Sequence, residues 1–239
     1  MKTALLVRAF ATAAFTVISA QAQEEFGNLN FENGYPVPVV GGEYEDEVTV
    51  ESALPSWSAS IGGVPLDVMI NNGYFLGGAM IEIFGPGWTN VQPGIIDGNE
   101  TVMLQAGGSS PLSGGGDASI SQYGEIPATA LSLQFKAWSM IPNATLAVSF
   151  AGNSLSPVLL SSGQSTSGQP YDVYGVDVSA YARHSGELEF TDVFDDQGLN
   201  GIELDDITFS TTAVTPEPNT LALVVMGGLA LAARRWRKK

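Results

Sequence analysis

The chain has 239 residues and no cysteine, which excludes disulfides, thiolate metal sites and cysteine nucleophiles. It has nine basic and 25 acidic residues, and all the acidic ones lie between Glu24 and Glu217, a stretch with only two basic residues, Lys136 and Arg183. The net charge of this stretch is therefore −23, which excludes nucleic acid as a partner because phosphate contacts need clustered lysines and arginines. Such a surface favours solubility or attracts cations, and both interpretations stay open.

The first 22 residues have the layout of a secretory signal peptide. Lys2 and Arg8 form a basic start, residues 9–18 are an apolar run, and Ala20-Gln21-Ala22 is a small-x-small cleavage site. We predict cleavage after Ala22, because the apolar run is short for the alternative, an uncleaved anchor.

Residues 23–214 are predicted to form one exported domain with an all-β fold. No window shows a sustained helical repeat of apolar residues, whereas alternation is common, as at Leu131, Leu133, Phe135 and Ala137. Many short strands separated by turns predict an antiparallel, jelly-roll-like β-sandwich. The other expected strands cover residues 48–50, 66–70, 80–84, 102–105, 146–150, 173–178 and 188–190. The Gly- and Ser-rich stretches 107–116 and 161–169 are expected to be loops.

The two ends of this domain resemble the galactose-binding-like jelly roll of many carbohydrate-binding modules. The resemblance is carried by Asn30-Phe31-Glu32-Asn33-Gly34, with Trp57 further on, and by the closing segment 201–209, GIELDDITF. It implies that the first and last strands pair, with a structural calcium ion between them.

The closing segment by itself predicts a β-bulge. Ile202 and Leu204 share one face of a regular strand, while Ile207 and Phe209 fall on the other, so an extra residue at Asp205-Asp206 would restore the register. Ca²⁺ binds six to eight oxygen ligands, and carboxylates at a bulge supply such oxygens. The predicted calcium ligands are therefore Glu32, Asp206, Asp205 and Asn30. The alternative is that the two aspartates face solvent.

Two further acidic runs are interpreted as solvated loops. One comprises Glu43, Glu45, Asp46 and Glu47, which lack the order of an EF-hand. The other comprises Asp192, Asp195 and Asp196, with Gly198 and Asn200, and is only loosely similar to a cation-binding loop.

Little in the domain indicates catalysis. His184 is the only histidine and no G-x-S-x-G motif is present, so nucleophilic triads and imidazole zinc sites are disfavoured. A carboxylate pair for glycoside hydrolysis stays open, because pairing is spatial. We predict a non-enzymatic protein. Sugar binding needs exposed aromatic rings, for which Trp88 and Trp138 are the candidates, whereas Trp57 is expected in the core.

The C-terminal segment 215–239 is predicted to be a membrane-sorting tail. Pro216-Glu217-Pro218 precedes 13 apolar residues, 221–233, and a basic end with Arg234, Arg235 and Arg237. A 13-residue helix is roughly 20 Å long against a bilayer core of about 30 Å, so flanking residues and snorkelling arginines must help it span. The basic end places that side in the cytoplasm.

This tail resembles the PEP-CTERM sorting domain of Gram-negative-type bacteria. The resemblance implies recognition by an exosortase, removal of the tail, and association with extracellular polysaccharide or biofilm. We therefore expect an exported protein, tethered to the inner membrane before processing and then held at the cell surface or in the matrix, with a carbohydrate ligand. Two alternatives stay open: a structural matrix protein without a defined ligand, and a glycan-active hydrolase.

Overall fold

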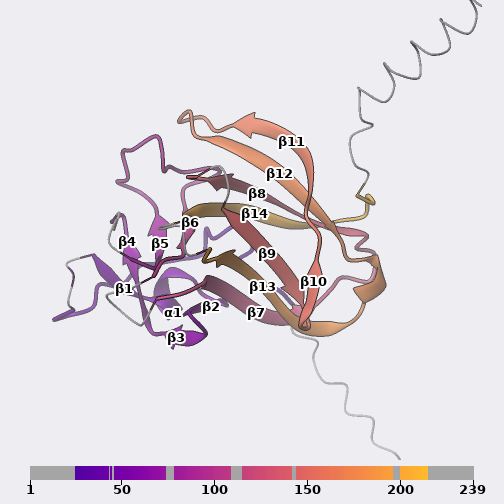
Figure 1. The fold of residues 1–239 in the computed structure, drawn as a ribbon, viewed down its shortest axis with the longest axis horizontal. Helices are drawn as coiled ribbons and strands as arrows, with labels where there is room; N and C mark the ends of the chain where they lie inside the picture. The colour runs from indigo at the N-terminus through magenta and orange to yellow at the C-terminus, as the bar shows by residue number, and fades with distance from the viewer. Residues whose placement is uncertain are drawn as a thin grey trace, which may run out of the picture.

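The computed structural model describes residues 25–42, 44, 46–73, 78–108, 115–141, 144–195 and 200–214. The predicted signal peptide, the tail with its helix 221–233, and Glu43, Glu45 and Asp196 lie outside these residues. The described chain is almost entirely β-structure arranged as two stacked sheets (Figure 1).

The larger sheet has eight strands in the order β1-β4-β5-β6-β14-β8-β12-β11. In that order the strands are Glu47–Thr49, Val68–Asn71, Met80–Phe84, Thr101–Gln105, Ile202–Ser210, Ser132–Ser139, Pro170–Asp177 and Val158–Gln164. The last strand in the chain, β14, therefore lies in the middle of the sheet.

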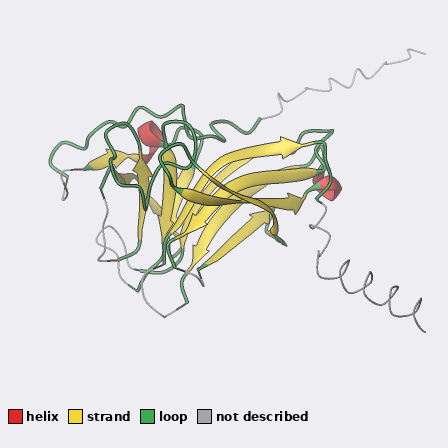
Figure 2. Ribbon diagram, turned by 90° about the horizontal axis from the view of Figure 1, so that it is seen from above, coloured by secondary structure: helices red, strands yellow, loops and turns green. Residues whose placement is uncertain are grey.

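The smaller sheet has six strands in the order β10-β9-β13-β7-β2-β3. In that order they are Asn153–Leu155, Thr145–Phe150, Ser185–Val193, Ala118–Glu125, Ser58–Ile61 and Val64–Leu66. Two single-turn helices, α1 (Val50–Ala53) and η1 (Ser179–Tyr181), lie at opposite ends of the stacked strands (Figure 2).

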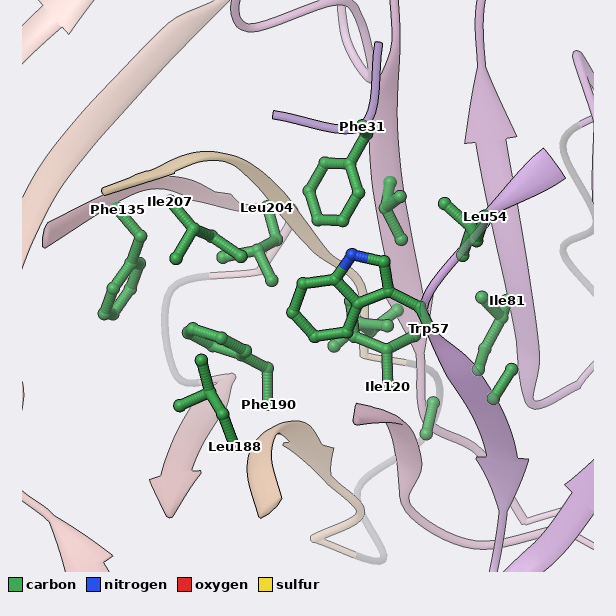
Figure 3. Packing of buried hydrophobic residues seen from close by; sticks show 14 of the residues in the cluster. Phe31, Leu54, Trp57, Ile81, Ile120, Phe135, Leu188, Phe190, Leu204 and Ile207 are labelled. Atoms are coloured by element: carbon green, nitrogen blue, oxygen red, sulfur yellow. The ribbon is translucent and has the colours of Figure 1, made fainter. Parts of the chain in front are cut away.

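The core fills the space between the sheets. Alternating residues of each strand point inward, such as Leu133 and Phe135 of β8 and Leu188 and Phe190 of β13. Trp57 is 5 % exposed, with ring centroids 5.7 Å from Phe31 and 6.3 Å from Phe190 (Figure 3). Its indole Nε1 donates a hydrogen bond to the Asn28 carbonyl oxygen at 2.9 Å, which satisfies the one polar group that this residue buries. The predicted core position of Trp57 is confirmed.

The chain crosses between the sheets repeatedly, as in a jelly roll, and nearly every strand pair is antiparallel. One pair departs from the all-antiparallel prediction, because β4 and β5 run parallel, with Ile70 opposite Glu82 and Asn71 opposite Ile83. No hydrophobic pattern reports strand direction, so the sequence did not indicate this pair.

The predicted bulge in the last strand is confirmed. Between Asp205 and Thr208 the pairing of β14 with β8 shifts by one residue, and Asp206 has a positive φ of 47°. Ile202, Leu204 and Ile207 are all buried as a result.

The N-terminal segment packs along β14 without forming a regular strand. The Ile207 amide donates to the Leu29 carbonyl oxygen at 2.9 Å, and the rings of Phe26 and Phe209 lie 5.5 Å apart. The two ends of the domain therefore meet, as the resemblance implied, although the contact is through one hydrogen bond and a ring pair.

Three loop predictions were wrong in part. Residues 161–164 belong to β11, whose serines are solvated because this strand is at the sheet edge. Glu47 lies in β1 and is 4 % exposed, and Asp192 lies in β13 and is fully buried. Each acid accepts a hydrogen bond from a backbone amide. The Tyr44 amide donates to Glu47, and the Ala106 amide, distant in sequence, donates to Asp192.

Candidate functional site

The outer face of the eight-stranded sheet carries buried carboxylates that hold the connection between β5 and β6. Glu203 of β14 accepts a hydrogen bond from the Gly94 amide at 2.6 Å, and its second oxygen accepts one from the Gln169 side chain at 2.7 Å. Asp205, two residues on, accepts from the Asp97 amide at 3.1 Å and from the Thr101 hydroxyl at 2.5 Å. These carboxylates therefore fix the start and the middle of the 94–101 loop to the sheet.

Glu32, from the N-terminal segment, holds the end of the same loop. Its Oε1 atom accepts from the Asn99 amide at 2.6 Å and the Glu100 amide at 3.0 Å, and its Oε2 atom accepts from the Asn99 side chain at 2.8 Å. Gly98 has φ of +55°, and a Cβ atom there would collide with the Glu32 carboxylate. The close approach of Glu32 thus depends on glycine at position 98.

Lys136 of β8 connects this loop to the bulge. Its ammonium group forms ion pairs with Asp97 and, at 3.0 Å, with Asp206. It also lies 5.3 Å from the centre of the Tyr171 ring, within cation–π range. The hydrogen bond from Lys136 lowers the pKa of Asp97. Burial alone would lower the pKa of Lys136, but its hydrogen bonds to Asp97 and Asp206 raise it above the ordinary value, so the ammonium stays charged.

A groove of about 330 Å³ lies between this loop and the turn that joins β11 to β12. One wall is formed by residues 95–98, including Asp97, and the other by Gln164, Ser165, Thr166 and Ser167, with Tyr171. The Ser167 hydroxyl donates to the Ile95 carbonyl oxygen at 3.4 Å, so the two walls touch. The groove combines an aromatic ring with a carboxylate, an amide and several hydroxyls.

A second cavity, of about 310 Å³, lies against the C-terminal half of β8. It is mainly apolar, and Trp138, Tyr174, Phe135 and Leu146 line it together with the hydroxyl residues Ser139 and Thr145. Trp138, one of the two predicted sugar platforms, is half-buried in this wall.

The other predicted platform, Trp88, is engaged within its own loop. Its ring stacks on Phe84 with centroids 4.4 Å apart and an interplanar angle of 17°, and its Nε1 atom donates to the Pro93 carbonyl oxygen at 2.9 Å. One ring face and the indole donor are therefore occupied.

The predicted calcium ligands lie around the same loop but have other partners. Glu32 and Asp205 accept amide and hydroxyl hydrogens, Asp206 pairs with Lys136, and Asn30 is exposed. Among the described residues, no three acidic or histidine side chains form a group that could hold a metal ion. The cation that Asp206 contacts is Lys136, and calcium binding at these residues stays a prediction.

Sequence reasoning did not identify the residues that form the groove. Asp97, Lys136 and Tyr171 come from a loop and two strands, so their proximity depends on the fold. The one signal in the sequence was charge, because Lys136 is one of only two basic residues between Glu24 and Glu217. An isolated lysine in such an acidic stretch is expected to pair with nearby carboxylates.

Burial raises the pKa of several carboxyl groups next to this site. The pKa of Asp205 is raised to about 8, and that of Glu203 lies well above its ordinary value. The pKa of Glu100 is raised to about 7 by burial and by the charge of Glu32. Away from the site, burial also raises the pKa of Asp192 to about 7.

Comparison with known proteins gives a match for the tail and little for the exported domain. No curated protein matches the chain significantly. A solved structure, the enzymatically active domain of tailspike protein 4 of bacteriophage CBA120, is similar at 19 % identity and a TM-score of 0.35, over 65 % of this chain and 19 % of the tailspike chain. The match thus spans about a fifth of that protein, and a similarity this low carries no argument about fold or activity.

Within the described residues, no helix is long and apolar enough to cross a membrane. Residues 214–238 match the PEP-CTERM protein-sorting motif, in agreement with the resemblance seen in the sequence. The motif indicates an exported surface protein that an exosortase processes.

Proposed function

We propose that the exported domain is a non-enzymatic carbohydrate-binding module that holds the processed protein in extracellular polysaccharide. The observation that carries this proposal is the groove between residues 95–98 and the β11–β12 turn. Its Tyr171 ring can pack against the apolar C–H face of a pyranose, while Asp97, Gln164 and the neighbouring hydroxyls bind sugar hydroxyl groups.

The charges around the groove favour a glycan without acidic groups. Lys136 is the basic side chain beside the groove, and two carboxylates already share its ammonium group. A uronate or sulfate would meet no unpaired cation there, and it would approach a domain with a net charge of −22. The proposed ligand is therefore an uncharged polysaccharide.

The same contacts argue against hydrolysis at this site. A glycosidase needs one carboxylic acid and one carboxylate flanking the glycosidic bond. Glu203 and Asp205 are buried beneath the loop and bonded to it, and Asp97 and Asp206 are paired with Lys136. Glu203 and Asp205 therefore have no access to a substrate, and Asp97 and Asp206 share one ammonium group instead of forming an acid and base pair.

Retention on immobilised neutral polysaccharides tests the proposal. Replacing Tyr171 by Ala should lower affinity about fivefold, since an aromatic contact contributes roughly 1 kcal/mol. Tyr123→Ala is the matched control, because Tyr123 is 58 % exposed on β7 in the other sheet. Equal retention of the Tyr171→Ala variant and the unaltered protein would remove the groove as the binding site.

Trp138→Ala and Trp88→Ala, measured in the same way, test the two platforms predicted from the sequence. Loss of retention in Trp138→Ala alone would move the ligand to the second cavity. Release of reducing ends from any bound glycan would instead support the hydrolase alternative.

A further inference from the structure

The strand β11 is an open edge that differs from the other three sheet edges of the described chain. It has seven residues, VLLSSGQ, without charge or proline, and its side chains are exposed or half-buried along its length. Leu159 is 47 % exposed. In the described part of the chain, β12 is its only strand partner.

Each of the other edges is short or blocked. Strands β10, β3 and β1 have three residues each, and β3 contains Pro65. The edge of β1 is covered by the preceding segment, whose Val39 amide donates to the Glu47 carbonyl oxygen at 2.9 Å. Natural sheets use short strands, prolines, coverage and β-bulges to prevent edge-to-edge pairing. Strand β11 has a bulge, but it is seven residues long, lacks proline and is uncovered in the described part of the chain.

We propose that β11 is a self-association edge, at which a second copy of this chain adds its own β11 in antiparallel orientation. Backbone N–H and C=O groups on the outer side of the strand supply the hydrogen bonds. Two eight-stranded sheets then become one continuous sheet across the two copies.

The absence of charge on β11 favours a second copy as the occupant, because two acidic domains can meet there without opposing their carboxylates. Most other encounters between two domains of net charge −22 oppose carboxylates to carboxylates, which costs free energy. A two-fold β11 pair instead places Val, Leu, Ser, Gly and Gln against the same uncharged set. Figure 1 shows β11 as the outermost strand at the top of the molecule, where a partner sheet can approach.

One feature limits how the two copies align. The pairing of β11 with β12 shifts between Leu159 and Ser161, so a bulge interrupts the strand at Leu160. Residues 161–164 form the regular stretch beyond the bulge and are the expected centre of the contact.

Because the chain lacks cysteine, a cysteine scan of β11 tests the proposal directly. The full chain, isolated from exporting cells, carries one substitution at a time: Leu159→Cys, Ser161→Cys, Ser162→Cys or Gln164→Cys, with Ser154→Cys on β10 and Val64→Cys on β3 as controls. Directly opposite residues in an antiparallel pair have Cα atoms about 4.5–5.5 Å apart, within disulfide reach. A residue one position away from the two-fold axis lies about 6.6 Å along the strand from the same residue of the other copy. We therefore expect the crosslinked dimer mainly with cysteine at one or two neighbouring positions.

A charge substitution provides the second measurement. Ser161→Lys should lower the fraction of dimer in light scattering at least tenfold, whereas Val64→Lys, at another exposed edge position, should leave it unchanged. Crosslinking no greater on β11 than at the β10 and β3 controls would overturn the proposal. So would equal crosslinking at all β11 positions, which signals unspecific aggregation, or crosslinks to a different protein.

Discussion

The Lys136 ammonium lies 5.3 Å from the centre of the Tyr171 ring while it pairs with Asp97 and Asp206. One side chain thus joins the loop, the bulge of β14 and the aromatic ring of the groove. Replacing it by Met should destabilise the domain by roughly 1 kcal/mol, because both aspartates are more than a third exposed and solvent screens the pairs, and should weaken glycan retention. Arg183→Met is the control, as Arg183 is exposed and the change in net charge is the same. Equal melting temperatures of the two variants would show that the Lys136 contacts contribute no stability.

The domain should be more stable at pH 5 than at pH 8. Asp205, Glu100 and Asp192 have folded-state pKa values of about 8, 7 and 7, whereas they titrate near pH 4 when unfolded. Between those values the folded state binds more protons, so the stabilisation is complete below about pH 4 and is lost as the pH rises to about 8. Thermal unfolding at constant ionic strength should show a melting temperature lower by about 5 °C or more at pH 8 than at pH 5. A melting temperature that rises over this range would contradict the burial of these groups in carboxyl form.

Glu100→Gln should remove part of this pH dependence. Glu100 is 6 % exposed, one of its oxygens has no hydrogen-bond partner, and the charge of Glu32 opposes its ionisation. A neutral amide of the same shape avoids that repulsion, so the variant should melt about 2–4 °C higher than the unaltered protein at pH 8 and equally at pH 5. Glu51→Gln, on the exposed side of α1, controls for the change in net charge. If the melting temperatures of Glu100→Gln and Glu51→Gln fall equally between pH 5 and pH 8, Glu100 does not contribute to the pH dependence of stability.

Calcium binding at Glu32, Asp205, Asp206 and Asn30 is tested by the melting temperatures in EDTA, in millimolar Ca²⁺ and in millimolar Mg²⁺, which screens the acidic surface in the same way. If the amides, the Thr101 hydroxyl and Lys136 replace the ion as partners of the three carboxyl groups, the melting temperatures in Ca²⁺ and Mg²⁺ should be equal. A rise with Ca²⁺ alone, abolished by Asp206→Asn, would instead establish the calcium site predicted from the sequence.

Mass spectrometry of the protein from its native host tests the processing signals. The mature form should begin near Gln23 and lack the residues after Pro218, since the sorting motif covers residues 214–238. The protein should be recovered from the matrix or the cell surface. A form that keeps residues 221–239 in the membrane fraction would be a plain anchored protein, and the polysaccharide role would lose its basis in sorting.

Strands with a strong hydrophobic pattern were predictable from the sequence, as was the bulge. The strand expected at 80–84 has the same bounds in the structure as β5, and the parity change between Leu204 and Ile207 located the extra residue of β14. Strand β7 was missed because its inner face combines Ile120 with Gln122 and Gly124. Phe26 covers Gly124, and Gln122 accepts a hydrogen bond from the Gly27 amide. Both residues of β7 are thus buried by a segment distant in sequence, and a hydrophobic pattern does not show this.

The groove was not predictable for a related reason. Asp97 lies 39 residues before Lys136 and neither sits in a recognisable motif, so their pairing follows from the sheet order and the loop that crosses it. Glu32, Asp205 and Asp206, which the sequence grouped as calcium ligands, all lie around the 94–101 loop. Their partners were not, because a sequence does not show whether a carboxylate meets a metal ion, an amide or a lysine.

The central position of β14 has a mechanical consequence for a protein held by its C-terminal end. A pull on the tail enters the domain at Ser210, the last residue of β14, and acts along a strand that is hydrogen-bonded to β6 on one side and β8 on the other. Force along such a strand loads both ladders in shear, so many hydrogen bonds must break together, whereas an edge strand could peel away one bond at a time. The C-terminal end of the domain is therefore a strand with neighbours on both sides, which resists a pull applied at that end.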